Sequence, residues 1–210
     1  MPESLTDRTR DRLLRAAGEV FAERGFRRAT VREICRRAHV NIASVNYYFK
    51  GKQELYDDVL EYSWRQVLRK YPDAQGTDPS PPEERLRRFV HTFLRRILDE
   101  GKPAWFGRLM AREIVEPTGA LERLIERAIR PLHETLHGLV REILGRRASP
   151  ETVRRHVFGI LGQCLFYRHG RHVISRIYPE MRFDAEEVER IAGHIFSASL
   201  AALRGPGARR

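Results

Sequence analysis

Hydrophobic residues recur at helical spacing along nearly the whole chain, and this periodicity limits the possible folds more than any other feature. In residues 83–100, for example, Leu86, Phe89, Val90 and Phe93 are spaced to line one face of a helix. Nowhere do β-branched residues alternate with polar ones for a full strand length between turn residues. The sequence therefore predicts an all-α fold of about nine helices.

A proline-rich segment, PDAQGTDPSPP at residues 72–82, interrupts the helical pattern. It holds four prolines and almost no apolar group, so a helix cannot propagate through it and no core can form there. We expect this segment to separate an N-terminal domain of residues 6–71 from a C-terminal domain of residues 83–204.

The N-terminal part is expected to contain a helix-turn-helix motif at residues 30–49. Thr30 and Glu33 form a capping box that opens a short helix, and Asn41 can cap the next one after the brief turn that begins at His39. In such a motif the second helix can enter the major groove of DNA. Helices are predicted here at about residues 6–25, 30–38, 41–48 and 52–71.

The C-terminal part is far larger than a DNA-binding module needs, so we expect it to bind a further ligand or partner. Pro131 lies inside a long predicted helix, where its missing N–H should leave a kink. Ser149 with Pro150, and Asp184, are the caps expected to open the last two helices. Helices are predicted here at about residues 83–100, 103–117, 118–145, 150–172 and 184–203.

The chain is strongly basic, with 39 Lys and Arg against 28 Asp and Glu and a formal net charge of +11. This balance favours a polyanionic partner, either nucleic acid or an anionic membrane surface. The basic residues are spread over several helices instead of forming one amphipathic stripe, so we expect no membrane partner. No apolar run is long enough to span a bilayer, and the polar start MPESLTDRTR does not resemble a signal peptide, so a cytoplasmic protein is predicted.

The two cysteines, Cys35 and Cys164, each lie in an apolar helical pattern and are far apart in sequence. We interpret them as reduced core residues, with a disulfide as the alternative.

The helix at residues 41–48 carries side chains suited to DNA. Val45 and Phe49 are four residues apart and should face the core, which leaves the remaining residues largely outward. Ser and Asn can read base edges, and Tyr can donate to phosphate, although any one of them alone is typical of a solvated surface. The candidate DNA-binding residues are Thr30, Ala43, Ser44, Asn46, Tyr47, Tyr48, Lys50 and Lys52.

Residues 13–60, LLRAAGEVFAERGFRRATVREICRRAHVNIASVNYYFKGKQELYDDVL, resemble the tetracycline-repressor (TetR) family of bacterial transcription regulators. Two family signatures stand here, F-A-x-x-G-[FY]-x-x-[TA]-[TS] and Y-[YH]-F-x-x-K-x-x-L. The resemblance implies DNA contacts at positions that correspond to Thr30, Ser44, Asn46, Tyr47, Tyr48 and Lys52.

Two residues depart from the family pattern. His39 stands where the family usually has glycine, so a non-glycine residue is expected to take a positive φ, which His tolerates better than branched residues do. Asn46 stands where most relatives carry Tyr, and Asn can make a bidentate contact to adenine that Tyr cannot. We therefore interpret Asn46 as a base-reading residue.

The stretches LMAREIVEPTGAL and HVFGILGQCLFY resemble the C-terminal domain of the CecR/CerR-type subgroup. The resemblance implies a homodimer through helices at about 150–172 and 185–203, and a pocket for an unknown small-molecule inducer. Large apolar groups with a few polar handles suit such a pocket, and packing in the core is the alternative for each of them. The candidate ligand-binding residues are Trp105, Phe106, Met110, Glu113, His133, Phe166 and Tyr167.

Residues 133–137, HETLH, fit the H-E-x-x-H zinc motif, which places two imidazoles one turn apart on a helix. The extended zinc-protease form needs a glycine and a third histidine where Val140 and Ile143 stand. We therefore expect no bound metal and no other cofactor, and keep His133 and His137 as weak metal candidates. The residues weighed as further ligands are Glu151, His156, His169 and His172.

The sequence predicts a sequence-specific DNA-binding transcriptional regulator that is not an enzyme. By resemblance it is a ligand-responsive repressor that acts as a homodimer on a palindromic operator in double-stranded DNA. The alternatives are a zinc-dependent hydrolase that uses residues 133–137 and a non-specific basic DNA-binding protein.

Overall fold

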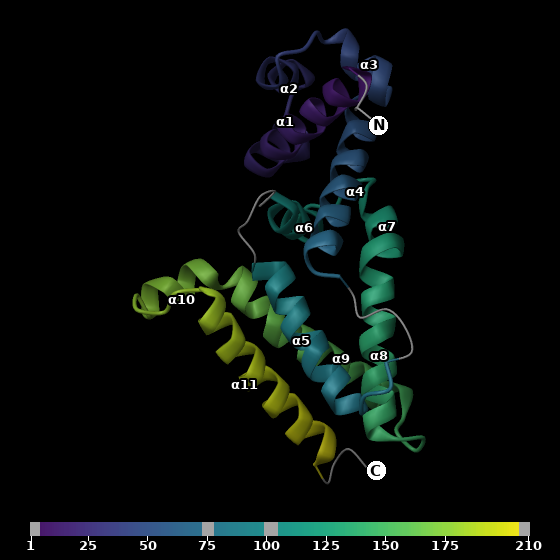
Figure 1. The fold of residues 1–210 in the computed structure, drawn as a ribbon, viewed down its shortest axis with the longest axis vertical. Helices are drawn as coiled ribbons and strands as arrows, with labels where there is room; N and C mark the ends of the chain where they lie inside the picture. The colour runs from purple at the N-terminus through teal and green to yellow at the C-terminus, as the bar shows by residue number, and fades with distance from the viewer. Residues whose placement is uncertain (1–4, 73–77, 99–104, 206–210) are drawn as a thin grey trace. The chain divides into compact units, whose positions relative to one another are not determined.

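The computed structural model describes residues 5–72, 78–98 and 105–205, and all regular structure in these ranges is helical, which confirms the all-α prediction (Figure 1). The chain forms two compact units, one of residues 1–70 and 100–128 and the other of residues 71–99 and 129–210. Residues 105–128, which the sequence predicts to lie in the C-terminal domain, thus belong to the same unit as the helix-turn-helix. Residues 73–77 of the proline-rich segment lie outside the described ranges.

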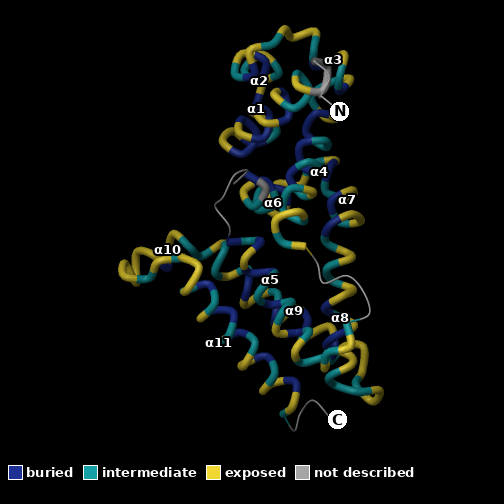
Figure 2. Tube along the Cα trace, viewed as in Figure 1, coloured by how far each residue is buried: buried dark blue, intermediate teal, exposed yellow. Residues whose placement is uncertain are grey.

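The first unit has a continuous apolar core. Leu13, Phe21, Ile34, Val45 and Val59 are fully buried, as their helical spacing predicts, and Figure 2 shows the buried side of each helix in dark blue. Its helices are α1 (Leu5–Arg28), α2 (Val31–Ala38), α3 (Ala43–Phe49), α4 (Lys52–Lys70), α6 (Trp105–Val115) and α7 (Leu121–Leu124).

Local hydrogen bonds fix the ends of α2 and α3. The Thr30 hydroxyl accepts a bond from the Glu33 N–H at 3.2 Å, so the cap predicted for α2 is present. The Asn41 side chain accepts a bond from the Ala43 N–H at 2.9 Å, but it forms a turn just before the helix, because the N-cap position of α3 is Ile42. His39 ends α2 in the left-handed region with φ 54°, which confirms the expectation of a positive φ at this position. The turn between the two helices therefore forms without glycine.

The second unit has a core of its own. Leu86, Leu94, Leu136, Val157 and Ile195 are buried in it. The predicted caps Ser149 and Asp184 accept hydrogen bonds from Thr152 N–H and Glu187 N–H at 3.1 and 2.9 Å. Its helices are α5 (Pro82–Leu98), α8 (Arg130–Leu144), α9 (Pro150–His169), α10 (Arg171–Ile177) and α11 (Ala185–Arg204).

The structure divides two of the predicted helices. The helix expected over 118–145 contains a single π-helical turn, Ile125–Ile129, just before Pro131. Proline lacks an N–H and its ring crowds the carbonyl four residues earlier, so a wider turn relieves the clash. The helix expected over 150–172 ends at His169, and α10 begins after Gly170.

Both cysteines are free and buried, as predicted. Burial raises the pKa of the Cys164 thiol to about 12. Across the described ranges, no helix is both long and apolar enough to cross a membrane.

Candidate nucleic-acid interface

Helix α3 has one buried face and one open face. Val45 and Phe49 are fully buried in the core of the first unit and fix the orientation of the helix. Asn46 is exposed, and Tyr47 is 77% exposed although it is a large aromatic residue. The exposed amide of Asn46 and hydroxyl of Tyr47 can both bond to a partner, so the open face is a candidate contact surface.

Two residues of the candidate DNA-binding set are also parts of the fold. Tyr48 is half-buried against the core, and its ring lies 4.9 Å from that of Tyr47 in an edge-on arrangement. The Lys52 ammonium donates to the Arg27 carbonyl at 3.3 Å and lies 4.6 Å from the centre of the Phe26 ring. Burial lowers the pKa of Lys52, so part of its surface is withdrawn from solvent.

The remaining candidates surround α3. Ala43 is exposed, Ser44 is half-buried, and the exposed Thr30 uses its hydroxyl as the cap of α2. Lys50 is exposed and ends α3 with φ 50°, and the adjacent Gly51 has φ 140°, a backbone conformation that favours glycine. This sharp turn places two lysines at the junction of α3 and α4.

Sequence reasoning did not select the exposed arginines of α2. Arg32 and Arg36 lie one turn apart on the solvent side of this helix, which is the first helix of the helix-turn-helix pair. In such motifs the first helix crosses the DNA backbone, so these guanidiniums are candidate phosphate contacts. The sequence could have indicated them, because they are four residues apart on the face of the helix opposite Ile34 and Ala38.

Helix α6 contributes three anchors to the same unit as α3. Trp105 is 5% exposed and packs so closely on α1 that a Cβ at Gly18 would lie 2.6 Å from its ring. The Arg112 side chain donates to the backbone carbonyls of Ala22 and Glu23, at 3.3 and 3.1 Å, near the end of α1. These contacts hold α1 and α6 together.

The third anchor is a buried carboxylate. Glu113 is completely buried and accepts hydrogen bonds from the Tyr56 hydroxyl at 2.7 Å and from both the backbone N–H and the hydroxyl of Thr118. Burial and this carboxylate raise the pKa of Tyr56 far above its usual range. Glu113 therefore ties α4 to α6 within the first unit.

The candidate ligand-binding residues are divided between the two units. Trp105, Met110 and Glu113 belong to the first unit, whereas His133, Phe166 and Tyr167 belong to the second. Trp105 and Glu113 are core residues, and Phe166 is 63% exposed with its ring 6.2 Å from that of Tyr167. The side chain of Phe106 lies outside the described part of the chain.

The H-E-x-x-H segment lies on α8, with the rings of His133 and His137 6.1 Å apart. Among the residues that the structure describes, no group of three or more His, Cys, Asp or Glu side chains is arranged to hold a metal ion. The two imidazoles thus have no third ligand in this part of the molecule.

Comparison with known proteins identifies the family. Residues 82–203 match the family model described as the C-terminal domain of the HTH-type transcriptional dual regulator CecR, and residues 13–59 match bacterial regulatory proteins of the tetR family. The chain belongs to the tetR family, with a C-terminal domain of the CecR type.

Individual relatives of this tetR-family protein span most of its length. It is 27% identical to CecR of Shigella flexneri over 88% of this chain and 86% of the relative. It is 26% identical to the transcriptional repressor NicS of Pseudomonas putida over 95% and 92% of the two chains. The crystal structure of HlyIIR, a hemolysin II transcriptional regulator, aligns with a TM-score of 0.62 at 25% identity, over 90% of this chain and 97% of that one.

These relatives are transcriptional regulators, and this tetR-family protein is one as well, as the sequence predicted. None of these comparisons supports the alternative of a zinc-dependent hydrolase.

Proposed function

We propose that the protein is a repressor that binds a near-palindromic operator as a homodimer in the cytoplasm and is released by a small-molecule inducer. The observation that carries DNA recognition is the open face of α3. Asn46 and Tyr47 are exposed on it, while Val45 and Phe49 hold the helix from behind. A helix held in this way can enter a major groove without changing its own packing.

Asn46 is proposed to read a base, and the surrounding hydroxyl and ammonium groups are proposed to position the helix. The Asn side chain offers one donor and one acceptor in the geometry that pairs with adenine. Tyr47 and Lys50, together with Arg32 and Arg36 of α2, supply donors to phosphate, which set the register and add salt-dependent affinity.

Dimerisation is proposed through α9 and α11, which pack against each other in the second unit. On α9, Phe158 and Phe166 are 58% and 63% exposed, and a Cβ at Gly159 or Gly162 between them would meet no atom within 4 Å. On α11 the exposed side carries small residues such as Ala198. A second copy can bury these faces in a four-helix arrangement with two-fold symmetry.

The two-fold symmetry sets the operator. Two helix-turn-helix heads related by a dyad read half-sites roughly one helical turn apart, about 34–36 Å. An inducer that binds better to a dimer with a different head separation lowers operator affinity by that difference in binding energy.

The test is a binding titration of untagged protein on the DNA upstream of its own gene and on scrambled DNA, at two salt concentrations. We expect tighter binding to the first by about a thousandfold or more. Equal and steeply salt-dependent binding to both would mean that only charge is read, and would contradict the proposal. Transcription in vitro from the bound promoter distinguishes repression from the dual regulation for which CecR is named.

A further inference from the structure

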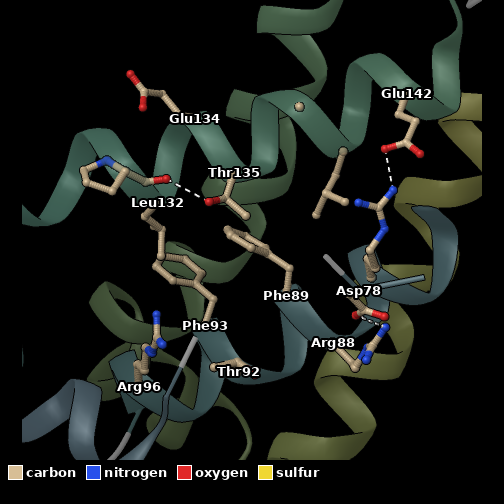
Figure 3. Close-up of a pocket in the computed structure, with 14 residues that line it drawn as sticks. Asp78, Arg88, Phe89, Thr92, Phe93, Arg96, Leu132, Glu134, Thr135 and Glu142 are labelled. Atoms are coloured by element: carbon tan, nitrogen blue, oxygen red, sulfur yellow. Dashed lines mark hydrogen bonds and ion pairs between the residues drawn. The ribbon is translucent and has the colours of Figure 1, made fainter. Parts of the chain in front are cut away.

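The second unit contains a cavity of about 550 Å³ between α5 and α8 (Figure 3). This volume lies in the range of small-molecule sites, about 300–1,000 Å³. None of the seven ligand-binding candidates predicted from the sequence lines this cavity, although Glu134, the neighbour of the candidate His133 in sequence, does. The cavity is therefore a distinct site whose chemistry follows from the residues that line it.

One part of the cavity is apolar and flat. Phe89 and Phe93 lie one turn apart on α5, with ring centres 6.0 Å apart and an angle of 21° between the rings. Figure 3 shows both rings between α5 and α8, where Leu132 also lines the cavity. Gly138 of α8 adds open space, because a Cβ there would meet no atom within 4 Å. This part suits a planar apolar ring.

The other part of the cavity presents two guanidiniums on the same side of α5. Arg85 donates through Nη2 to Glu142, and the Nη2 of Arg88 lies 2.5 Å from a carboxylate oxygen of Asp78. The Nε atoms of both arginines are buried and have no hydrogen-bond partner among the described residues. A buried Nε cannot be reached by a ligand, but each guanidinium carries five N–H donors and contacts one carboxylate through Nη2, so both retain the N–H donors of Nη1 for an incoming acceptor.

The local charge favours a single negative charge on that acceptor. Arg85, Arg88 and the buried Arg96 bring three positive charges, and the paired carboxylates of Asp78 and Glu142 bring two negative ones. The Glu134 carboxylate adds a third negative charge, but Glu134 and Glu142 are both exposed, so solvent screens them more than it screens the half-buried Asp78 and the arginines dominate the field inside the cavity. A carboxylate supplies one charge and two oxygens in the geometry that arginine binds in bidentate fashion.

We propose that this cavity binds a small aromatic carboxylate, with its ring on Phe89 and Phe93 and its carboxylate on Arg85 and Arg88. The inference rests on the proposed function only in taking this ligand as the inducer. Binding to the cavity itself needs no DNA.

The first test is calorimetric titration of the full-length protein, without DNA, with naphthoate and with naphthylmethanol. The two probes share the ring and differ in the charged group. We expect naphthoate to bind at least about tenfold more tightly, since a charge-assisted hydrogen bond is roughly twice as strong as a neutral one. Equal affinities, or no saturable naphthoate binding, would overturn the proposal.

Variants of α5 and α8 test the named contacts. Arg88→Gln should weaken naphthoate binding about tenfold and leave naphthylmethanol unchanged. Arg87→Gln is the matched control, because Arg87 is exposed on the same helix and does not line the cavity, and it should change neither affinity. A loss of the same size in both variants would show that only general charge is sensed, and would overturn the assignment.

Glu142→Gln should change naphthoate affinity in the opposite direction to Arg88→Gln. This exposed residue competes for Arg85, so its neutralisation should strengthen naphthoate binding by a few fold. Unchanged or weaker naphthoate binding would argue against the contact with Arg85. Operator titrations on the same variants keep the two proposals separate, because failure of naphthoate binding with intact operator binding overturns the cavity alone.

Discussion

The substitution Gly18→Ala tests how tightly α1 and α6 pack against each other. Gly18 is buried inside α1, and an added Cβ would lie 2.6 Å from three atoms of the Trp105 ring. Carbon atoms in contact are normally about 3.5–4.0 Å apart, so the ring must move by roughly 1 Å. Trp105 is 5% exposed and stacks on Tyr62 with ring centres 6.2 Å apart, which leaves it little room to move.

Two effects of opposite sign meet at this position. Ala is favoured over Gly in a helix interior by about 1 kcal/mol. Overpacking a filled core costs about 1–3 kcal/mol. We therefore expect Gly18→Ala to lower the free energy of unfolding by about 1 kcal/mol, where helix propensity alone predicts a gain of the same size.

The assay is urea unfolding followed by far-UV circular dichroism at one protein concentration, because the proposed dimerisation would make the apparent stability depend on concentration. Gly138→Ala is the control, because its Cβ meets no atom within 4 Å and only propensity should act. In a Trp105→Leu background, which removes the ring, Gly18→Ala should become stabilising, and the difference between backgrounds measures the coupling. A Gly18→Ala protein more stable than the parent would refute the reasoning.

Three further predictions concern the first unit. Asn46→Ala should relax the preference for one base of each half-site in a binding series on single-base operator variants, whereas uniform weakening would make Asn46 a positioning residue. Tyr56→Phe should destabilise the protein by about 1–3 kcal/mol, because it leaves the buried Glu113 carboxylate short of a donor. Because the pKa of Tyr56 is raised in the folded protein, only the unfolded phenol ionises above about pH 10, and the free energy of unfolding should fall as pH rises further. Urea unfolding at several pH values should show a smaller decrease for Tyr56→Phe, which has no phenol to ionise. His39→Val should lower the melting temperature far more than His39→Gly, because a β-branched residue resists the φ of 54° found there; equal shifts would count against strain at this turn.

Local structure was largely predictable from the sequence. The caps at Thr30, Ser149 and Asp184 depend on residues three positions away, and each forms the expected hydrogen bond. The positive φ of His39 was expected from the resemblance, because the family usually carries glycine at this position. The buried pair Val45 and Phe49 follows from helical spacing, and with it the open face of α3.

The candidate ligand residues show where such reasoning stops. Trp105 is a large apolar residue and Glu113 is polar, and ligand pockets combine residues of both kinds. A protein core can combine them as well. Their partners, Gly18 and Tyr56, lie 87 and 57 positions away in sequence, so no local pattern connects them. The cavity between α5 and α8 likewise depends on two helices separated by more than 30 residues.

The sequence by itself determined the helical class, the capped helix starts at Thr30, Ser149 and Asp184, the two faces of α3 and the family, because each depends on short spacings and on motifs within one segment. Only the tertiary structure decided that residues 105–128 belong to the same unit as the helix-turn-helix, that Trp105 fills the space left by Gly18, and that Arg85 and Arg88 line a cavity beside two phenylalanine rings. These features arise from which side chains distant in sequence fill the same space. Close packing allows few such arrangements, but helical periodicity alone does not select among them.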